Sequence, residues 1–234
     1  MALQPFRFKN FSVAQEGAAH PVGTDAVLLG AWAGVGQCTR LLDIGTGTGV
    51  VALMLAQRCA ARITAVEIHP ASAALARANF AASPWANRLE LVESSIQEFA
   101  GQTAVRFDLI VSNPPFFSET TVSPDATRRL GRHNASLPPE TLLLCAKQLL
   151  TETGRFCVVL PVQEGRRLCE IAVTNGLYCT EETEVRGRPE KPVERLLLCF
   201  ERNPYPFVRK QMSIYGTGTT RSAEFQEMTA AFYL

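Results

Sequence analysis

Residues 41–49 read Leu-Leu-Asp-Ile-Gly-Thr-Gly-Thr-Gly, an apolar run that passes directly into a glycine-rich loop. The apolar part predicts a short buried strand, and the stretch from Val50 to Arg58 predicts an apolar helix after the loop. Glycines allow positive φ angles and let a ligand touch the backbone. The spacing is GxGxG, whereas the dinucleotide fingerprint is GxGxxG, so a pyrophosphate is not the obvious ligand.

The same alternation of strand and helix continues on both sides of this loop. Apolar runs predict strands at 63–67, 89–92, 107–112, 155–160, 178–184 and 195–200. Helices are predicted from Pro70 to just before Ser83, at 137–150 and at 163–174. Repeated strand–helix units indicate an α/β fold, a doubly wound parallel sheet with helices on both faces.

The length of 234 residues fits one α/β domain, 1–234. We expect its core at 39–200, an N-terminal appendage at 1–38 and a C-terminal tail at 201–234. The appendage contains a turn entering a helix, for which Thr24 or Asp25 is the expected cap. Both end segments are expected to pack on the single domain.

Composition excludes several classes of protein. The net charge of +1 is no strong electrostatic footprint, so any nucleic-acid surface must be local. Seven scattered cysteines without a CxxC pair indicate buried reduced thiols rather than disulfides or zinc, and no metal is expected. No apolar stretch reaches the length of a membrane span, and no signal-peptide core is apparent. A cytoplasmic enzyme is therefore expected.

Glu67 ends the second predicted strand, twenty residues beyond Gly47. An acid at this position of a doubly wound sheet can accept hydrogen bonds from both hydroxyls of a ribose. The simpler interpretation is a tight strand–helix turn followed by an exposed glutamate. The glycine loop and Glu67 together favour a cofactor that carries a nucleoside.

Asn113-Pro114-Pro115-Phe116 follows the predicted strand 107–112. Two prolines supply no ladder N–H and fix φ, so the strand must end in a stiff corner. The Asn113 amide oxygen and the Pro114 carbonyl can each accept one hydrogen of an exocyclic NH2 group, and Phe116 can stack on its ring. The alternative is a plain loop with Phe116 in the core. With the glycine loop nearby, a reacting site is favoured.

These three motifs resemble the S-adenosylmethionine-dependent amino-methyltransferases of the Rossmann-like class. The resemblance covers about residues 39–200 and implies a seven-stranded sheet whose last strand is antiparallel. It implies that the glycine loop contacts the methionine part of the cofactor, and that Ser95, where this class often has Asp, contacts the adenine. The implied catalytic residues are Asn113, Pro114, Pro115 and Phe116, and the implied cofactor-binding residues are Thr24, Asp43, Gly45, Thr46, Gly47, Gly49, Glu67, Ile68, Ser95, Ile96 and Asn113.

The whole chain, from 22–32 to the terminal 231–234, resembles the bacterial family of tRNA(Val) adenine-N6 methyltransferases, which modify adenine 37 beside the anticodon. That family more often has Tyr at the position of Phe116. Asn-Pro-Pro-Phe also occurs in ribosomal RNA guanine-N2 methyltransferases, so that target stays open. Protein-glutamine N5 methyltransferases share the corner but usually carry a long helical N-terminal domain. A cofactor-binding module without catalysis and a dehydrogenase fit the motifs less well.

Local clusters of positive charge are the candidate contacts with the anticodon region of a tRNA. The cluster nearest the Asn-Pro-Pro-Phe corner is expected to bind RNA, and a second one surrounds the loop between the last two predicted strands. We expect the protein to act as a monomer. The first cluster is Arg128, Arg129, Arg132 and His133, and the second is Arg186, Arg188, Lys191 and Arg195.

Overall fold

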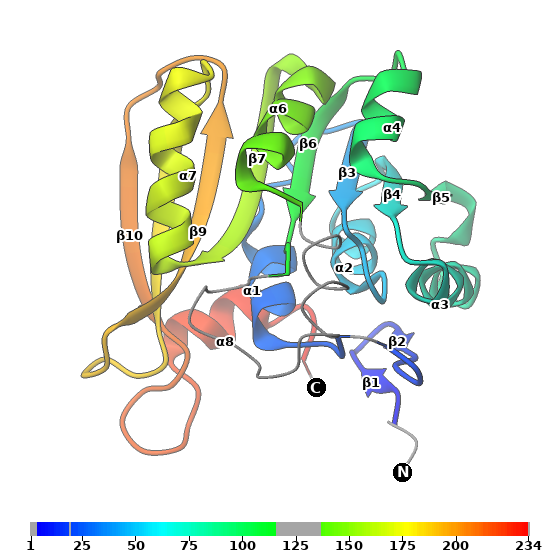
Figure 1. The fold of residues 1–234 in the computed structure, drawn as a ribbon. Coiled ribbons are helices and arrows are strands. Elements are labelled where there is room, and N and C mark those ends of the chain that lie inside the picture. The colour runs from blue at the N-terminus through cyan, green and yellow to red at the C-terminus, as the bar shows by residue number, and fades with distance from the viewer. Residues whose placement is uncertain (1–3, 19, 116–136, 234) are drawn as a thin grey trace, which may run out of the picture.

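A single large sheet forms the centre of the computed structural model (Figure 1). The structure describes residues 4–18, 20–115 and 137–233, and within them this sheet has eight strands in the order β10-β8-β9-β7-β6-β3-β4-β5. Strand β9 is antiparallel to β7 and β8, and every other pair of neighbours is parallel. The strands are β3 (Arg40–Ile44), β4 (Arg62–Glu67), β5 (Leu89–Glu93), β6 (Phe107–Ser112), β7 (Leu150–Pro161), β8 (Tyr178–Arg186), β9 (Val193–Glu201) and β10 (Val208–Ser213).

The parallel arrangement gives the sheet two different edges. All strands except β9 end at one of them, which we call the carboxyl edge, and begin at the other, the amino edge. In Figure 1 the arrowheads of β3, β4 and β6 mark the carboxyl edge at the lower end of the sheet. Ligands of open parallel sheets bind outside the carboxyl ends of the strands.

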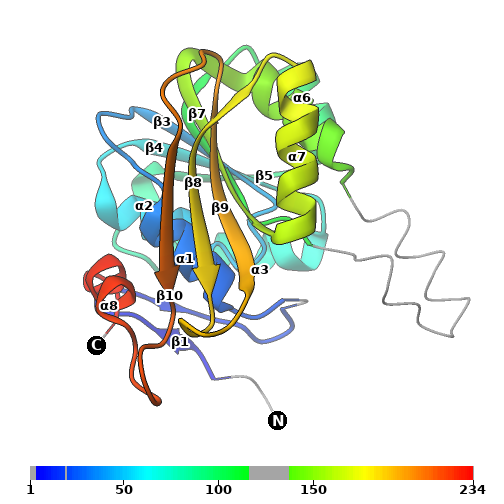
Figure 2. The same ribbon diagram turned by 90° about the vertical axis from the view of Figure 1, so that its left-hand side faces the viewer.

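Helices cover both faces of the sheet, because side chains of alternating residues point to opposite faces. Leu41 and Leu109 join the core on one face, and Leu42 and Ile110 join the core on the other. Figure 2 shows α1, α2 and α8 on one side of the strands and α6 and α7 on the other. The helices are α1 (Thr24–Trp32), α2 (Val50–Arg58), α3 (Pro70–Ala81), α4 (Ile96–Gln102), α6 (Pro139–Leu149), α7 (Val162–Thr174) and α8 (Ala223–Thr229), with a 3-10 turn, η1 (Ala86–Arg88).

The predicted doubly wound sheet is confirmed, including its antiparallel last strand. The seven predicted strands correspond to β3 through β9, and β9 is the antiparallel one. Strand β10, from the C-terminal tail, was not predicted. It pairs in parallel with β8 at the edge of the sheet, and of its residues only Met212 is buried. An edge strand with so little apolar character carries no clear strand pattern.

Two helix starts differ from the expectation. The N-cap of α1 is Gly23, without a side-chain cap, so the predicted cap from Thr24 or Asp25 is wrong. Asp25 instead accepts a hydrogen bond from Arg195 Nε, with 2.8 Å between nitrogen and Oδ2. Helix α4 was not predicted, although Ser95 and Glu98 form a capping box at its start.

The N-terminal segment contributes a two-stranded hairpin, β1 (Phe6–Arg7) and β2 (Ser12–Val13). The Asn79 side chain of α3 fastens the following residue, Ala14, through both its backbone groups, at 2.9 and 3.1 Å. The same amide donates to the Thr48 carbonyl of the glycine loop at 2.9 Å. One buried side chain thus joins the N-terminal segment to the loop.

The composition predicts reduced cysteines and no metal site. The seven cysteines are free thiols, and Cys145, Cys157 and Cys199 are buried. Among the described residues, no three or more His, Cys, Asp or Glu side chains lie close enough together to hold a metal ion. In the same residues, every helix is too short or too polar to cross a lipid bilayer.

Candidate active site

A cavity of about 660 Å³ opens at the carboxyl edge of β3, β4, β5 and β6. This volume lies within the range of small-molecule and cofactor sites. One wall comes from residues 20–26, which enter α1, and another from the segment after β6. Of the residues predicted to bind a cofactor or to react, those that line it are Thr24, Asp43, Gly45, Thr46, Gly47, Glu67, Ile68, Ser95, Ile96, Asn113, Pro114 and Pro115.

The glycine loop presents bare backbone to the cavity. Gly45 and Gly47 have φ angles of 70° and 56°, and a Cβ atom on either would meet nothing within 4 Å. The N–H groups of Gly45 and Thr46 both donate to the Val66 carbonyl, at 2.9 and 3.2 Å, which fixes the loop against β4. The space beside both glycines is where a bound molecule could touch the backbone.

Gly49 has a different role from the other loop glycines. It does not line the cavity but is the N-cap of α2, with φ 83°. A Cβ atom there would lie 2.5 Å from the Phe80 ring. The glycine is therefore required for helix packing, and its predicted cofactor contact stays a prediction.

Asp43 lies beneath the loop with only 1% of its surface exposed. Its Oδ2 accepts a hydrogen bond from the Thr46 hydroxyl at 2.6 Å. Burial, with a smaller contribution from the charge of Glu67, raises the pKa of Asp43 to about 7, although hydrogen bonds from Thr46 and the Ala52 N–H oppose the rise. The Asp43 carboxyl group therefore keeps its proton to a much higher pH than an ordinary aspartate does.

Glu67 is held by two backbone N–H groups at the end of β4. Gly47 N donates to Oε2 and His69 N donates to Oε1, each at 2.9 Å. A carboxylate has about four acceptor positions, so two remain for a ligand. Glu67 is thus fixed in orientation and able to accept a pair of hydroxyls, as the sequence predicts for a ribose.

Ser95 lines the cavity, but its hydroxyl is already engaged. It donates to Glu98 Oε2 at 2.8 Å and accepts from Glu98 N at 3.2 Å. The Ser-x-x-Glu spacing was the signal for this capping box. Beside it, Ile96 is buried and Ile68 is 55% exposed, so the neighbouring surface is apolar.

The corner after β6 follows the strand next to β3, whose end leads into the glycine loop. Ser112 Oγ donates to the Ile44 carbonyl at 3.0 Å, which ties the end of β6 to the end of β3. Asn113 and Pro114 are half-buried, and with Pro115 they line the same cavity as Glu67. Phe116 lies outside the described residues, as do Arg128, Arg129, Arg132 and His133.

The wall from residues 20–26 was largely missed by sequence reasoning. It contributes His20, Pro21, Gly23 and Asp25 in addition to the predicted Thr24. The segment is held by Gln15, whose side chain accepts from Val22 N at 2.7 Å and donates to the Gln4 carbonyl at 3.0 Å. Contacts of this kind join residues without a shared local pattern.

Comparison with known proteins identifies the family. The family model of the methyltransferase small domain matches residues 26–167. A protein of Yersinia pseudotuberculosis serotype O:3 (strain YPIII) named tRNA1(Val) (adenine(37)-N6)-methyltransferase is 41% identical over 231 residues, which cover 98% of this chain and 92% of that protein. This chain belongs to that methyltransferase family.

Solved structures support the fold of this methyltransferase. A protein described as a predicted O-methyltransferase from Agrobacterium tumefaciens superimposes with a TM-score of 0.69 at 19% identity, covering 89% of this chain and 96% of that one. SMU.776, solved in complex with SAH, has a TM-score of 0.57 at 13% identity over 81% of this chain and 53% of that one. At such identities the likeness concerns the fold alone.

Proposed function

We propose that this methyltransferase transfers a methyl group from S-adenosylmethionine to the N6 amino group of an adenine in tRNA, at position 37 of tRNA(Val), in the cytoplasm. The observation that carries the proposal is a single cavity lined both by the glycine loop with Glu67 and by the Asn113-Pro114-Pro115 corner. The relative from Yersinia pseudotuberculosis, which bears this activity in its name, matches 98% of the chain and supports the same target.

The cofactor half of the cavity fits S-adenosylmethionine. When bound, this molecule supplies an electrophilic methyl carbon attached to a sulfonium. Glu67 would accept hydrogen bonds from the two ribose hydroxyls, because it lines the cavity and the Gly47 and His69 N–H groups take only two of its acceptor positions. The open backbone at Gly45 and Gly47 would receive the methionine part.

The base of the cofactor fits the apolar side of the cavity. Ile68 keeps 55% of its surface exposed although it is a large apolar residue, and Ile96 lies at the start of α4. Both line the cavity, so an adenine ring between them would cover Ile68. Because the Ser95 hydroxyl is engaged by Glu98, Ser95 would contribute backbone groups rather than its side chain.

The Asn113 corner would act on the target amine by orientation. An adenine N6 lone pair is delocalised into its ring, so the amine is a weak nucleophile. If the Asn113 side-chain oxygen and the Pro114 carbonyl each accept one N6 hydrogen, the nitrogen becomes more tetrahedral and its lone pair points out of the ring plane. Positioning and oriented dipoles then supply the catalysis. The target base must leave its stack to reach this corner, where Phe116 would stack on it.

The remaining expectations belong to the same proposal. We treat 1–234 as one domain with its core at 39–200, active as a monomer on the anticodon region of the tRNA. The candidate RNA contacts that follow the corner in the sequence stay Arg128, Arg129, Arg132 and His133. Their replacement by alanine should raise the Michaelis constant for tRNA.

The test is mass spectrometry of nucleosides from tRNA incubated with the enzyme and methyl-labelled S-adenosylmethionine. The expected product is labelled N6-methyladenosine, confined to the fragment that contains position 37. Ribosomal RNA and a glutamine-containing peptide serve as competing substrates in parallel incubations. Labelled N2-methylguanosine or methylated glutamine, without N6-methyladenosine, would overturn the proposal and identify the competing activity.

A further inference from the structure

We propose that a basic projection at the carboxyl edge binds the phosphate backbone of the substrate RNA, an inference that rests on the proposed RNA substrate. The projection consists of the loop 187–192, between β8 and β9, and the loop 214–222, between β10 and α8. Figure 1 shows both loops extending beyond the sheet at the end marked by the arrowheads of β3, β4 and β6.

Backbone hydrogen bonds make the two loops one unit. Ile214 N donates to the Arg186 carbonyl at 2.9 Å, and Tyr215 N donates to the Gly187 carbonyl at 3.0 Å. These bonds continue the parallel pairing of β8 and β10 past the ends of both strands. A third link runs from the Arg188 guanidinium to the Gly218 carbonyl. The projection therefore holds its shape before any ligand arrives.

Tyr215 organises the cations of the projection. The guanidinium carbon of Arg188 lies 5.7 Å from the centroid of its ring, and that of Arg221 lies 4.4 Å away. Arg221 also lies 4.6 Å from the ring of Phe225, which is buried. Stacking on aromatic rings keeps the guanidinium charge and leaves N–H groups for a phosphate. Less side-chain entropy is then lost when the phosphate binds.

The cations inside the two loops form no ion pair with the described residues, whereas Arg186 and Arg195 at their base pair with Glu184 and Asp25. The loops 187–192 and 214–222 carry three cationic side chains, Arg188, Lys191 and Arg221, and one acidic side chain, Glu190, a net charge of +2, whereas the whole chain has +1. In the described part of the chain, no carboxylate lies within 4 Å of the charged atoms of Arg188, Lys191 or Arg221.

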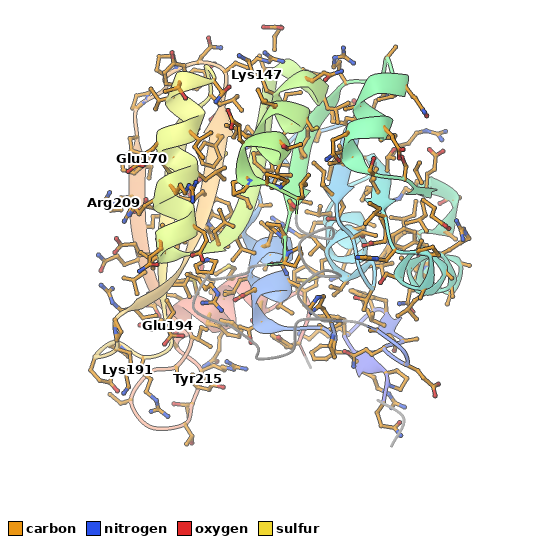
Figure 3. All side chains as sticks on the ribbon, viewed as in Figure 1. Lys147, Glu170, Lys191, Glu194, Arg209 and Tyr215 are labelled. Atoms are coloured by element: carbon orange, nitrogen blue, oxygen red, sulfur yellow. The ribbon has the colours of Figure 1, made fainter. Side chains whose placement is uncertain are left out.

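Three cations on the neighbouring α7 and β10 are paired with acidic side chains. Arg166, Arg209 and Lys210 all pair with glutamates of β8. Figure 3 separates the two groups: Lys191 and Tyr215 lie at the end of the molecule that bears the projection, whereas Arg209 lies beside β10. Uncompensated positive charge is thus found on the projection and not on this flank, which favours a polyanionic ligand there.

An ion pair connects the projection to the cavity. Arg195, at the base of the loop 187–192, donates to Asp25, and Asp25 lines the cavity. A strand of RNA bound along the projection would therefore run beside the mouth that a target base must enter. Phosphate contacts of this kind fix register and orientation, and leave the choice of base to the cavity.

The test compares two double variants with the same change in charge. Arg188→Ala with Lys191→Ala alters the projection, and Arg62→Ala with Arg106→Ala alters two exposed arginines at the amino edge, at the starts of β4 and β6. Binding of tRNA is measured by fluorescence anisotropy over a series of KCl concentrations, and S-adenosylmethionine binding by calorimetry. Lys191→Glu serves as a single variant, because Lys191 is exposed and its replacement leaves the fold intact.

The projection variant should bind tRNA roughly 10- to 100-fold more weakly, with a slope of log K against log salt reduced by about 2. Its cofactor affinity and its turnover at saturating tRNA should stay within about threefold of the wild type, and Lys191→Glu should weaken tRNA binding in the same direction. The amino-edge variant should match the wild type.

Unchanged tRNA affinity and salt slope in the projection variants would overturn the inference. If the wild type binds tRNA at the projection but methylates no adenine, the proposed function fails and the projection stands; if the wild type binds no RNA, both fail.

Discussion

The two ends of β6 carry similar polar residues in opposite situations. At the amino edge, Asp108 Oδ2 accepts hydrogen bonds from Thr39 N, Thr39 Oγ1 and Arg40 N, at 2.8, 2.9 and 3.1 Å. At the carboxyl edge, Asn113 lines the same cavity as the glycine loop. The amino end is thus saturated by its own protein, whereas the carboxyl end is shaped around a space for another molecule.

The ionisation of two aspartates shows the same contrast. Burial raises the pKa of Asp108, but the hydrogen bonds from Thr39 and Arg40 outweigh it and hold that pKa below its ordinary value. Asp43, at the carboxyl edge on the neighbouring strand, has a pKa raised to about 7, chiefly by burial. Asp108 thus stabilises the fold, whereas ionised Asp43 lowers the stability of the folded state. Such a destabilising charge beside a cavity is expected of a functional position.

The largest expected effect is the pH dependence of the free energy of unfolding, which tests the contrast between Asp43 and Asp108. Folded Asp43 keeps its proton up to about pH 7, whereas the unfolded chain releases it near 3.8. Between these values the folded state binds more protons, so its stability falls as pH rises and is constant above the window. The shift corresponds to roughly 4 kcal/mol in the ligand-free protein. Urea unfolding at pH 4 and pH 8 should show most of this fall in the wild type and in Asp108→Asn. An equal fall in Asp43→Asn would contradict the assignment.

Asn113→Ala should have the next largest effect, on activity rather than on stability. Loss of one preorganised polar contact to the reacting group costs about 10²–10³ in turnover, or roughly 3–4 kcal/mol. Methyl transfer to tRNA should fall by that factor, while calorimetric affinity for S-adenosylmethionine stays within a few fold. Asp108→Ala, at the other end of β6, is the control and should keep its turnover. Parallel losses of cofactor affinity and turnover in Asn113→Ala would remove Asn113 from the chemistry.

Glycine-to-alanine changes at the two edges should have opposite signs. At the carboxyl edge, Gly49→Ala combines φ 83° with a contact of 2.5 Å to the Phe80 ring, which is itself buried. It should lower the free energy of unfolding by about 2–3 kcal/mol. Gly101→Ala, near the amino-edge end of α4, meets nothing within 4 Å and should raise it by about 0.5–1 kcal/mol. Equal effects in thermal unfolding would show that Gly49 is not under packing constraint.

Asp108→Ala should have the smallest effect. Its partners Thr39 and Arg40 are exposed, so water can replace the lost acceptor, and we expect a loss of about 1 kcal/mol at pH 7. Because the folded pKa of Asp108 is lowered, the stabilisation is present above the unfolded pKa and is lost as the pH falls. The difference between variant and wild type should therefore shrink on acidification to pH 3. A difference that grows there would contradict the role given to Thr39 and Arg40.

The fold and the cofactor side of the site could be predicted because local patterns encode them. The apolar run at 41–44 and the glycines after it specify a strand, a turn and a helix start within a dozen residues. Strand β10 escaped prediction because it forms at an edge, where a strand needs few apolar residues. Ser95 lines the cavity as predicted for a cofactor contact, but its hydroxyl bonds to Glu98, three residues later, in a capping box that was not predicted from the sequence.

Other properties of the site depend on distant parts of the chain. The cavity wall at 20–26 is held by Gln15, and the raised pKa of Asp43 follows chiefly from its burial in the folded protein. Neither can be read from neighbouring residues. Asp25 pairs with Arg195, which lies 170 residues away in the sequence. Local sequence therefore predicted that Asp25 could cap α1, whereas it forms an ion pair.

The Asn79 side chain links two segments that are far apart in the sequence, the N-terminal hairpin and the glycine loop. Its amide bonds the backbone of Ala14 and the Thr48 carbonyl together, so order in the N-terminal hairpin and order in the glycine loop share one anchor. By thermodynamic reciprocity, any molecule that steadies the loop must also steady residues 11–16, to the extent that the anchor couples them. Amide hydrogens in that stretch would then exchange more slowly once S-adenosylmethionine is bound. Removal of the first fourteen residues would lower the affinity for the cofactor, although residues 4–14 do not line the cavity.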